Sequence, residues 1–192
     1  MLSSVLRSIA DEFAPAVLAS SLSAEDMVLT HAIASARLPI GVFILDTGRL
    51  HADTLNLVGE VRERYGLEIK VYQPDKKGVD EYVARHGRDA FYGSLELRKR
   101  CCEIRKVEPL GRALAGKRAW ITGLRRAQSA LRTEIAVEEI DEARGRKLAS
   151  PRARARIRGH GPQFCGGREA TERLAHGVQS AVKLTRVSRR EP

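Results

Sequence analysis

Runs of apolar residues alternate with amphipathic segments through the first 149 residues of the chain. The apolar runs are short and bounded by turn residues, which is typical of buried strands. They predict strands at Val17–Leu22, Ile40–Leu45, Leu67–Tyr72 and Ala119–Gly123, with a weaker candidate at Ile135–Ile140. Helical spacing between them predicts helices at Ala24–Arg37, 52–65, Val79–His86 and Ser94–Leu114, the last kinked or restarted at Pro109. This order predicts an α/β fold with a mostly parallel sheet flanked by helices.

The pattern changes after Ser150, where arginine alternates with small residues and few apolar positions recur. We predict one domain over residues 1–149 and a disordered or weakly helical tail over 150–192, because the tail has little apolar surface to bury. The tail holds ten of the 34 Lys and Arg residues but three of the 24 Asp and Glu residues, so most of the net charge of +10 belongs to it. Apart from Phe164 it lacks aromatic residues for base stacking, which disfavours nucleic-acid recognition.

Composition narrows the class of protein further. A chain of 192 residues that is 43% hydrophobic can bury one core. Its N-terminus lacks the basic head and unbroken apolar stretch of a signal peptide, and no run reaches the roughly 18 apolar residues of a membrane span. Three cysteines are an odd and small set for a disulfide framework. These features predict a cytoplasmic protein.

Three polar segments follow predicted strands, where ligands bind in open α/β sheets. The first, Ser20–Asp26, is a Ser-rich turn that opens a helix, and its free backbone N–H groups would suit phosphate or sulfate. The alternative is an ordinary capped helix with Ser23 and Asp26 as the N-cap pair. The candidate binding residues of this segment are Ser20, Ser21, Ser23 and Asp26.

The second segment follows the clearest strand and contains Asp46, Thr47, Gly48 and Arg49. Its side chains can hydrogen-bond a ribose or base edge and pair with an anion, or they form only a turn in which His51 caps the next helix. The third segment begins at Gly123. Its arginines could hold a phosphosulfate or could lie on a solvated helix face, and its candidates are Gly123, Arg125, Arg126, Ser129 and Arg132.

Adjacent cysteines, Cys101 and Cys102, lie within a run of basic residues from Arg98 to Lys106. The positive surroundings would favour thiolates and offset the charge of an iron–sulfur cluster. The alternative is that both are small buried apolar residues.

In order and spacing, the chain resembles the adenylylsulfate and phosphoadenylylsulfate reductase family from Phe13 to Leu148. The resemblance rests on four motifs, SSLSAEDMVL from Ser20, LDTGRLH from Leu45, KRCCEIRKVEPL from Lys99 and WITGLRRAQS from Trp120. It implies an adenine nucleotide α-hydrolase-like sheet of the PP-loop type. It also implies that Cys101 and Cys102 are two ligands of a [4Fe–4S] cluster. The paired cysteines indicate the branch that uses adenylylsulfate.

The implied activity is reduction of adenylylsulfate to sulfite and AMP by a thiol donor such as thioredoxin, in sulfate assimilation and cysteine biosynthesis. In that family a cysteine of a C-terminal Glu-Cys-Gly-Leu-His segment attacks the sulfur, and thiol exchange releases sulfite. This chain reads Lys147-Leu-Ala-Ser-Pro151 where the later motifs should begin, and it lacks both that segment and the Cys-x-x-Cys pair. Ala127 also stands where the family often has an acidic residue.

Cysteine number limits what the chain can do, because a [4Fe–4S] cluster normally takes four thiolates. The third cysteine, Cys165, matches neither the missing ligands nor the nucleophile, so we assign no catalytic residue and expect impaired catalysis. We hypothesise that residues 150–192 arise from a frameshifted reading. The alternatives are a nucleotide-binding protein without redox activity and a PP-loop ATP pyrophosphatase or nucleotidyl transferase. The sequence does not decide whether the protein is a homo-oligomer in which two chains share a cluster through their Cys101 and Cys102 pairs.

Overall fold

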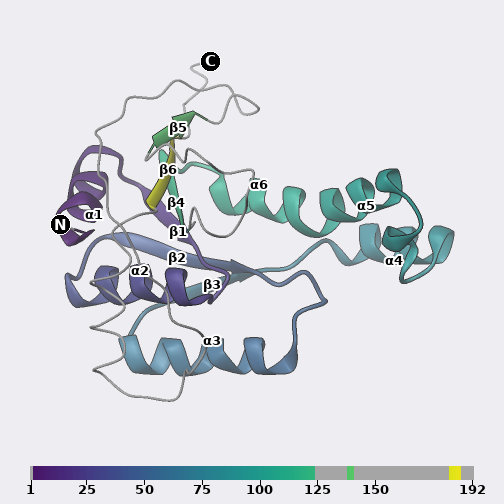
Figure 1. Ribbon diagram of the computed structural model, residues 1–192, viewed down its shortest axis with the longest axis horizontal. Coiled ribbons are helices and arrows are strands. Elements are labelled where there is room, and N and C mark those ends of the chain that lie inside the picture. The colour runs from purple at the N-terminus through teal and green to yellow at the C-terminus, as the bar shows by residue number, and fades with distance from the viewer. Residues whose placement is uncertain (1, 124–137, 141–181, 187–192) are drawn as a thin grey trace, which may run out of the picture.

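The computed structural model describes residues 2–123, 138–140 and 182–186 (Figure 1). Its helical elements are α1 (Leu2–Glu12), α2 (Ala24–Ser35), α3 (Ala52–Tyr65), α4 (Lys76–His86), η1 (Ala90–Tyr92), α5 (Leu95–Cys102), η2 (Glu103–Val107) and α6 (Glu108–Leu114). Its strands are β1 (Ala16–Ala19), β2 (Ile40–Leu45), β3 (Ile69–Tyr72), β4 (Ala119–Gly123), β5 (Glu138–Ile140) and β6 (Val182–Arg186). Among these described residues, no helix is long and apolar enough to cross a membrane.

The strands form one sheet in the order β3-β2-β1-β4-β6-β5. Strands β3, β2, β1 and β4 run parallel, β6 runs antiparallel to β4, and β5 runs parallel to β6. The predicted α/β fold with a mostly parallel sheet is therefore confirmed. The chain proceeds outward from β1 to β3 and then returns to place β4 on the other side of β1. This reversal makes the carboxyl ends of β1 and β4 the topological switch point of the sheet.

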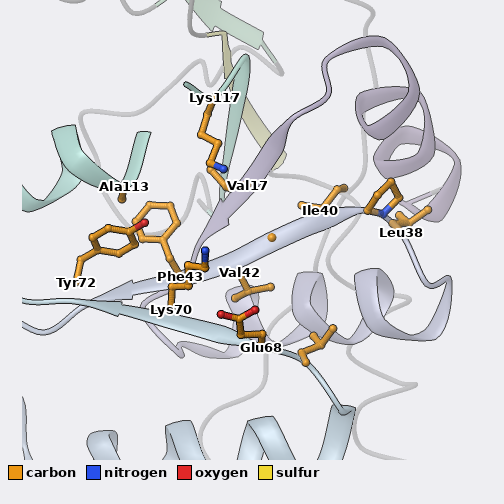
Figure 2. Close-up of a pocket in the computed structure, with 13 residues that line it drawn as sticks. Val17, Leu38, Ile40, Val42, Phe43, Glu68, Lys70, Tyr72, Ala113 and Lys117 are labelled. Atoms are coloured by element: carbon orange, nitrogen blue, oxygen red, sulfur yellow. The ribbon is translucent and has the colours of Figure 1, made fainter. Parts of the chain in front are cut away.

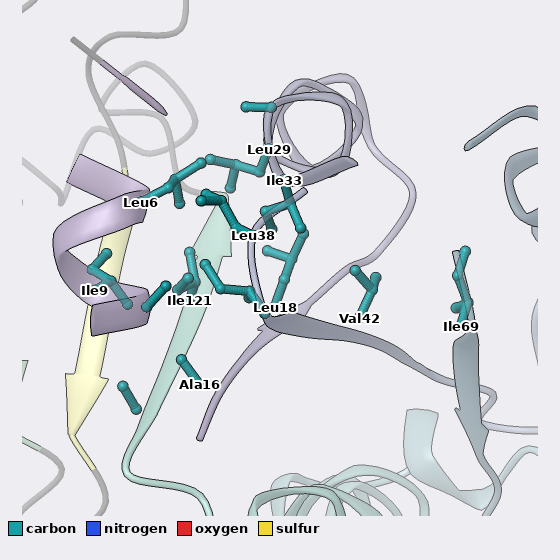
Figure 3. Packing of buried hydrophobic residues seen from close by; sticks show 14 of the residues in the cluster. Leu6, Ile9, Ala16, Leu18, Leu29, Ile33, Leu38, Val42, Ile69 and Ile121 are labelled. Carbon is teal, nitrogen blue, oxygen red and sulfur yellow. The ribbon is translucent and has the colours of Figure 1, made fainter. Parts of the chain in front are cut away.

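The two faces of the sheet are covered by different helices. Helices α1, α2 and α3 pack on one face, where Leu6, Leu18, Leu29, Ile33 and Ile121 are fully buried (Figure 3). Helix α6 packs on the other face and buries a smaller cluster made by Val17, Phe43, Ala113 and Leu114. Strand β2 contributes to both clusters, which explains why its sequence reads as a nearly unbroken apolar run. The core thus fixes the four parallel strand ends relative to one another.

Predicted and observed elements agree best where a buried face is complete. Strand β2 and the helix at 52–65 have the predicted bounds. Strand β1 ends at Ala19, three residues before the predicted end, and Leu22 in the loop that follows adopts a left-handed conformation with φ 61°. Helix α4 begins at Lys76, three residues before the predicted start, because the Asp75 carboxylate caps it by accepting from Gly78 N at 2.9 Å.

The predicted helix over Ser94–Leu114 is divided by the π-helical segment η2. The N–H of Glu108 bonds to Glu103 O, five residues back, and Pro109 then occupies the first turn of α6. Proline has no N–H to donate and its ring displaces the preceding turn, which accounts for the break at this position. Figure 1 shows α6 and α5 as a helical run that leads away from the sheet to α4.

Within the segment predicted as a disordered or weakly helical tail, Val182–Arg186 forms β6 beside β4. Strand pairing with an existing sheet edge satisfies backbone groups that the local sequence alone does not reveal. The weaker strand prediction holds for Glu138–Ile140, whereas residues 135–137 lie outside the described residues. The remainder of 150–192, including Cys165, also lies outside them.

Candidate functional site

The Asp26 carboxylate joins the two strand ends at the switch point. It is 3% exposed, and its Oδ2 accepts hydrogen bonds from the N–H and the hydroxyl of Ser21, both at 2.6 Å. Its Oδ1 accepts from Gly123 N, at the end of β4, at 3.0 Å. Hydrogen bonds to an ionised acceptor are the stronger kind, and here they offset the cost of burying a carboxylate. Asp26 therefore ties the Ser-rich loop after β1 to β4.

Glycine is required at position 123 by the closeness of this contact. A Cβ atom there would overlap Asp26 Oδ1 and would lie 3.0 Å from Glu25 Cβ and 3.1 Å from Asp26 N. The last of these is a backbone atom and cannot turn away. The close approach of β4 to the start of α2 thus depends on the missing side chain.

The N-cap interpretation of Ser23 and Asp26 is correct in position but not in bonding. Ser23 occupies the N-cap of α2, yet its side chain makes no capping hydrogen bond; instead, the Ser23 hydroxyl donates to Asp26 Oδ2 at 3.3 Å. Asp26 reaches past Ser23 to Ser21 in place of forming a capping box. The Ser20 hydroxyl accepts from Leu22 N at 3.1 Å. The first turn of α2 carries the buried carboxylates of Glu25 and Asp26, which complement the positive end of the helix dipole.

The loop after β2 is held by its own side chains. Asp46 is 6% exposed; its Oδ1 accepts from Gly48 N and its Oδ2 from the side-chain amide of Gln73, each at 2.9 Å. His51 caps α3, because its Nδ1 accepts from Asp53 N at 3.3 Å. These contacts match the turn interpretation of the segment. Any ligand would meet the backbone of this loop more readily than the Asp46 carboxylate.

Arg49 pairs with an anion of the protein itself. Its Nη1 lies 2.9 Å from Asp89 Oδ1, its Nη2 donates to the Arg88 carbonyl, and its guanidinium stacks 5.0 Å from the Phe91 ring centroid. Asp89 and Phe91 belong to the connection between α4 and α5. Arg49 thus links the loop after β2 to that connection.

The cysteine pair ends α5, and both thiols are free and partly buried. Burial raises the pKa of the Tyr82 phenol above its usual value, and Cys101 contributes in the same direction. The Tyr82 hydroxyl donates to Leu97 O at 3.1 Å and so fastens α4 to α5. We call the elements α4, η1, α5 and η2 the helical arm. The cysteine pair lies on this arm, and Arg49 contacts the arm at its α4–α5 connection.

The donor set does not fit a [4Fe–4S] cluster held by this chain alone. Within the described residues, no group of three or more His, Cys, Asp or Glu side chains is placed to hold a metal, and the whole sequence has three cysteines. Four thiolates are normally needed. Cys101 and Cys102 could supply two of them.

Of the third predicted segment, only Gly123 is among the described residues; Arg125, Arg126, Ser129 and Arg132 lie outside them. The structure therefore brings together Ser20, Ser21, Ser23, Asp26 and Gly123 at the switch point, with Asp46–Arg49 following the next strand. Two residues were missed by sequence reasoning. Gln73 is a polar residue directly after β3, and this position at a strand end is the sequence signal that could have marked it as a site residue. Arg105 has no such signal, because in sequence it is one of several basic residues around the cysteines.

A groove of about 380 Å³ lies on the α6 face of the sheet (Figure 2). Val17, Gly41 and Phe43 line it, with Lys70 and Lys117 among the charged residues at its wall. None of the candidate site residues that the structure describes lines this groove. It includes residues that precede β2, β3 and β4, so it lies toward the amino ends of these strands and apart from the switch point.

A parallel sheet with a Ser-rich loop at its switch point and a second polar loop after the adjacent strand defines an α/β nucleotide-binding fold of the PP-loop type. Residues 15–157 match the family model described as phosphoadenosine phosphosulfate reductase domain. The chain belongs to this family.

Relatives agree with this assignment. A protein from Burkholderia cepacia named adenosine 5'-phosphosulfate reductase is 62% identical over 135 residues, which cover 70% of this chain and 54% of that protein. A protein of the same name from Allochromatium vinosum is 48% identical over 149 residues, covering 78% and 58%. The chain thus spans about half the length of the curated relatives it matches.

A solved structure shows the same fold. The crystal structure of phosphoadenylyl-sulfate (PAPS) reductase from Candida auris, a phosphate complex, has a TM-score of 0.61 and 26% sequence identity to this chain. The match covers 75% of this chain and 68% of that one. The resemblance inferred from the four sequence motifs is therefore confirmed.

Proposed function

We propose that this chain is the nucleotide-binding part of an adenylylsulfate reductase and binds adenylylsulfate or AMP at the carboxyl ends of its strands. The observation that carries the proposal is the Asp26 carboxylate, which holds Ser21 and Gly123 together at the switch point. This bonding shapes the Ser-rich loop that leads into α2, and in this proposal the backbone N–H groups of that loop bind the phosphosulfate. In this proposal the second loop, at Asp46–Arg49, follows β2 and contacts the nucleoside.

The remaining candidates extend the same site. Arg125, Arg126, Ser129 and Arg132 follow β4, and in this proposal their guanidinium and hydroxyl groups complete the phosphosulfate site begun by Gly123. The activity of the family to which this site belongs is reduction of adenylylsulfate to sulfite and AMP in sulfate assimilation. Its thiol donor would be thioredoxin or a similar protein, its product would supply cysteine biosynthesis, and its location would be the cytoplasm.

We propose that this chain alone binds adenylylsulfate but does not reduce it. The cysteine that attacks sulfur in the family has no counterpart among the sequence motifs present, and sulfur transfer requires such a nucleophile. Cys101 and Cys102 would contribute two cluster ligands if further thiolates came from another chain.

The test is calorimetric titration of the purified chain with AMP and with adenylylsulfate. Asp26→Asn replaces one carboxylate oxygen by an NH₂ group, which cannot accept the hydrogen bond that Ser21 N or Gly123 N now donates. The loop should lose its shape, and we expect the Kd to be at least roughly tenfold weaker, equal to about 1.4 kcal/mol. Asp11→Asn, on the exposed side of α1, is the matched control and should bind like the original chain. Failure of the original chain to bind either nucleotide would refute the proposal.

Activity and metal content separate binding from catalysis. Incubation with adenylylsulfate and either thioredoxin or dithiothreitol should release no sulfite above background, and iron should be well below the four atoms per chain that a full cluster requires. Stoichiometric iron together with turnover would contradict the proposed loss of catalysis. Pyrophosphate release from ATP would instead favour the ATP pyrophosphatase alternative.

A further inference from the structure

Arg105 is a buried cation at the edge of the candidate site. It is 9% exposed, it lies three residues after Cys102 within η2, and its Nη1 donates to the Thr47 carbonyl at 2.8 Å. The contact spans 58 positions of sequence. No carboxylate within the described part of the chain forms an ion pair with it. A buried guanidinium that donates to a backbone carbonyl fixes that carbonyl in place.

Arg105 lies within the π-helical segment η2, which separates α5 from α6 and is followed by Pro109. Segments of this kind are local distortions of a helix and are frequent at functional sites. Gly48 completes the fit, because it has φ 70° and a Cβ atom there would lie 3.3 Å from Arg105 Nη1.

Two arginines therefore connect the loop at Asp46–Arg49 to the helical arm in opposite directions. Arg105 reaches from the arm to Thr47, and Arg49 reaches from the loop to Asp89 and the Phe91 ring. The arm is itself fastened, since Tyr82 of α4 donates to Leu97 of α5. A displacement of the cysteine-bearing segment cannot leave the loop unaffected.

We propose that Arg105 is a positioning residue that couples the nucleotide loop at Asp46–Arg49 to the Cys101–Cys102 segment, so that nucleotide occupancy controls the reactivity of the two thiols. The inference rests on the proposed nucleotide binding. A ligand that holds the loop in one position also holds Arg105 and the turn behind it. Local opening of that turn exposes the thiols, and its suppression slows their reaction.

The experiment measures alkylation of the full chain by iodoacetamide, with and without saturating AMP. Mass spectrometry of the peptide that contains Cys101 and Cys102 gives the rate. We expect AMP to slow alkylation at least threefold in the original chain. In Arg105→Met the slowing should disappear at AMP concentrations that saturate that variant. Arg85→Met removes an exposed arginine from the last turn of α4 and should retain the full effect.

The outcomes distinguish the inference from the proposed function. If AMP binds but does not slow alkylation in the original chain, the coupling is refuted and nucleotide binding stands. If Arg105→Met retains full protection, AMP shields the thiols directly and Arg105 is not the connection. If AMP does not bind, both proposals fail. Should Arg105→Met not fold, Arg49→Met breaks the opposite contact at a partly exposed side chain, and unchanged protection there refutes the coupling.

Discussion

Replacement of Gly123 by alanine tests the central contact of the candidate site. The new methyl group would overlap Asp26 Oδ1 and approach the backbone N of Asp26 to 3.1 Å. Either the carboxylate moves and loses the hydrogen bond from Gly123 N, or the end of β4 moves away from the start of α2. A hydrogen bond to a charged group contributes about 1.5–3 kcal/mol, and overpacking costs about 1–3 kcal/mol.

The two costs are not simply added, because movement of the carboxylate relieves part of the overpacking. We therefore expect Gly123→Ala to lower the free energy of unfolding by about 3 kcal/mol. Urea unfolding followed by circular dichroism measures this quantity. Gly59→Ala is the control, because a Cβ atom at Gly59 in α3 meets nothing within 4 Å. Alanine is the better helix former, so that variant should gain up to about 1 kcal/mol.

A double-mutant cycle then assigns the cost to the carboxylate. In an Asp26→Ala background the overlap with Oδ1 and the hydrogen bond to it are both gone, while the close contacts with Glu25 Cβ and Asp26 N remain. Gly123→Ala should therefore cost less by about 1–3 kcal/mol than in the original chain, but should not become neutral. A loss below about 0.5 kcal/mol for Gly123→Ala alone, or strictly additive losses in the cycle, would refute the reasoning. In either case Asp26 would not be holding β4 in place.

Three further predictions follow from other contacts. Asp46→Ala leaves the Gly48 N–H and the Gln73 amide without their acceptor and should lower the free energy of unfolding by about 1–3 kcal/mol, more than the exposed cap variant Asp75→Ala; an equal or smaller loss in urea unfolding contradicts this. The raised pKa of Tyr82 means that the folded state keeps this proton longer than the unfolded chain, so this stabilisation is present below the ordinary tyrosine pKa of about 10 and is lost as pH rises through the folded-state pKa. Tyr82→Phe should therefore remove part of the alkaline destabilisation seen in thermal melts, and an unchanged pH profile would contradict the assignment. Reading the coding DNA across Leu148–Pro151 in its other frames should reveal the Cys-x-x-Cys and Glu-Cys-Gly-Leu-His segments; their absence from both frames would make residues 150–192 a divergent tail.

Much of the fold follows from local sequence. The apolar run Ile40–Leu45 and the helical spacing over 52–65 predicted their elements to the residue, because each has a complete buried face and clear turn residues at its ends. The four motifs predicted the family. The alternation of strands and helices predicted a parallel sheet, because parallel strands need helical crossovers.

Tertiary structure decided what the polar residues do. Sequence marked Ser21, Asp26 and Gly123 as ligand-binding candidates, but the bonds between them depend on β4 lying beside β1, which no local signal specifies. Asp46 was a candidate for the ribose, and the fold occupies its carboxylate with Gly48 and Gln73. In sequence Arg105 is one of several basic residues near the cysteines, whereas in the structure it lies in the π-helical segment and donates a hydrogen bond to Thr47 O. Periodicity records which side faces the core, whereas the partner of a buried charge is set by which distant segments the sheet order brings together.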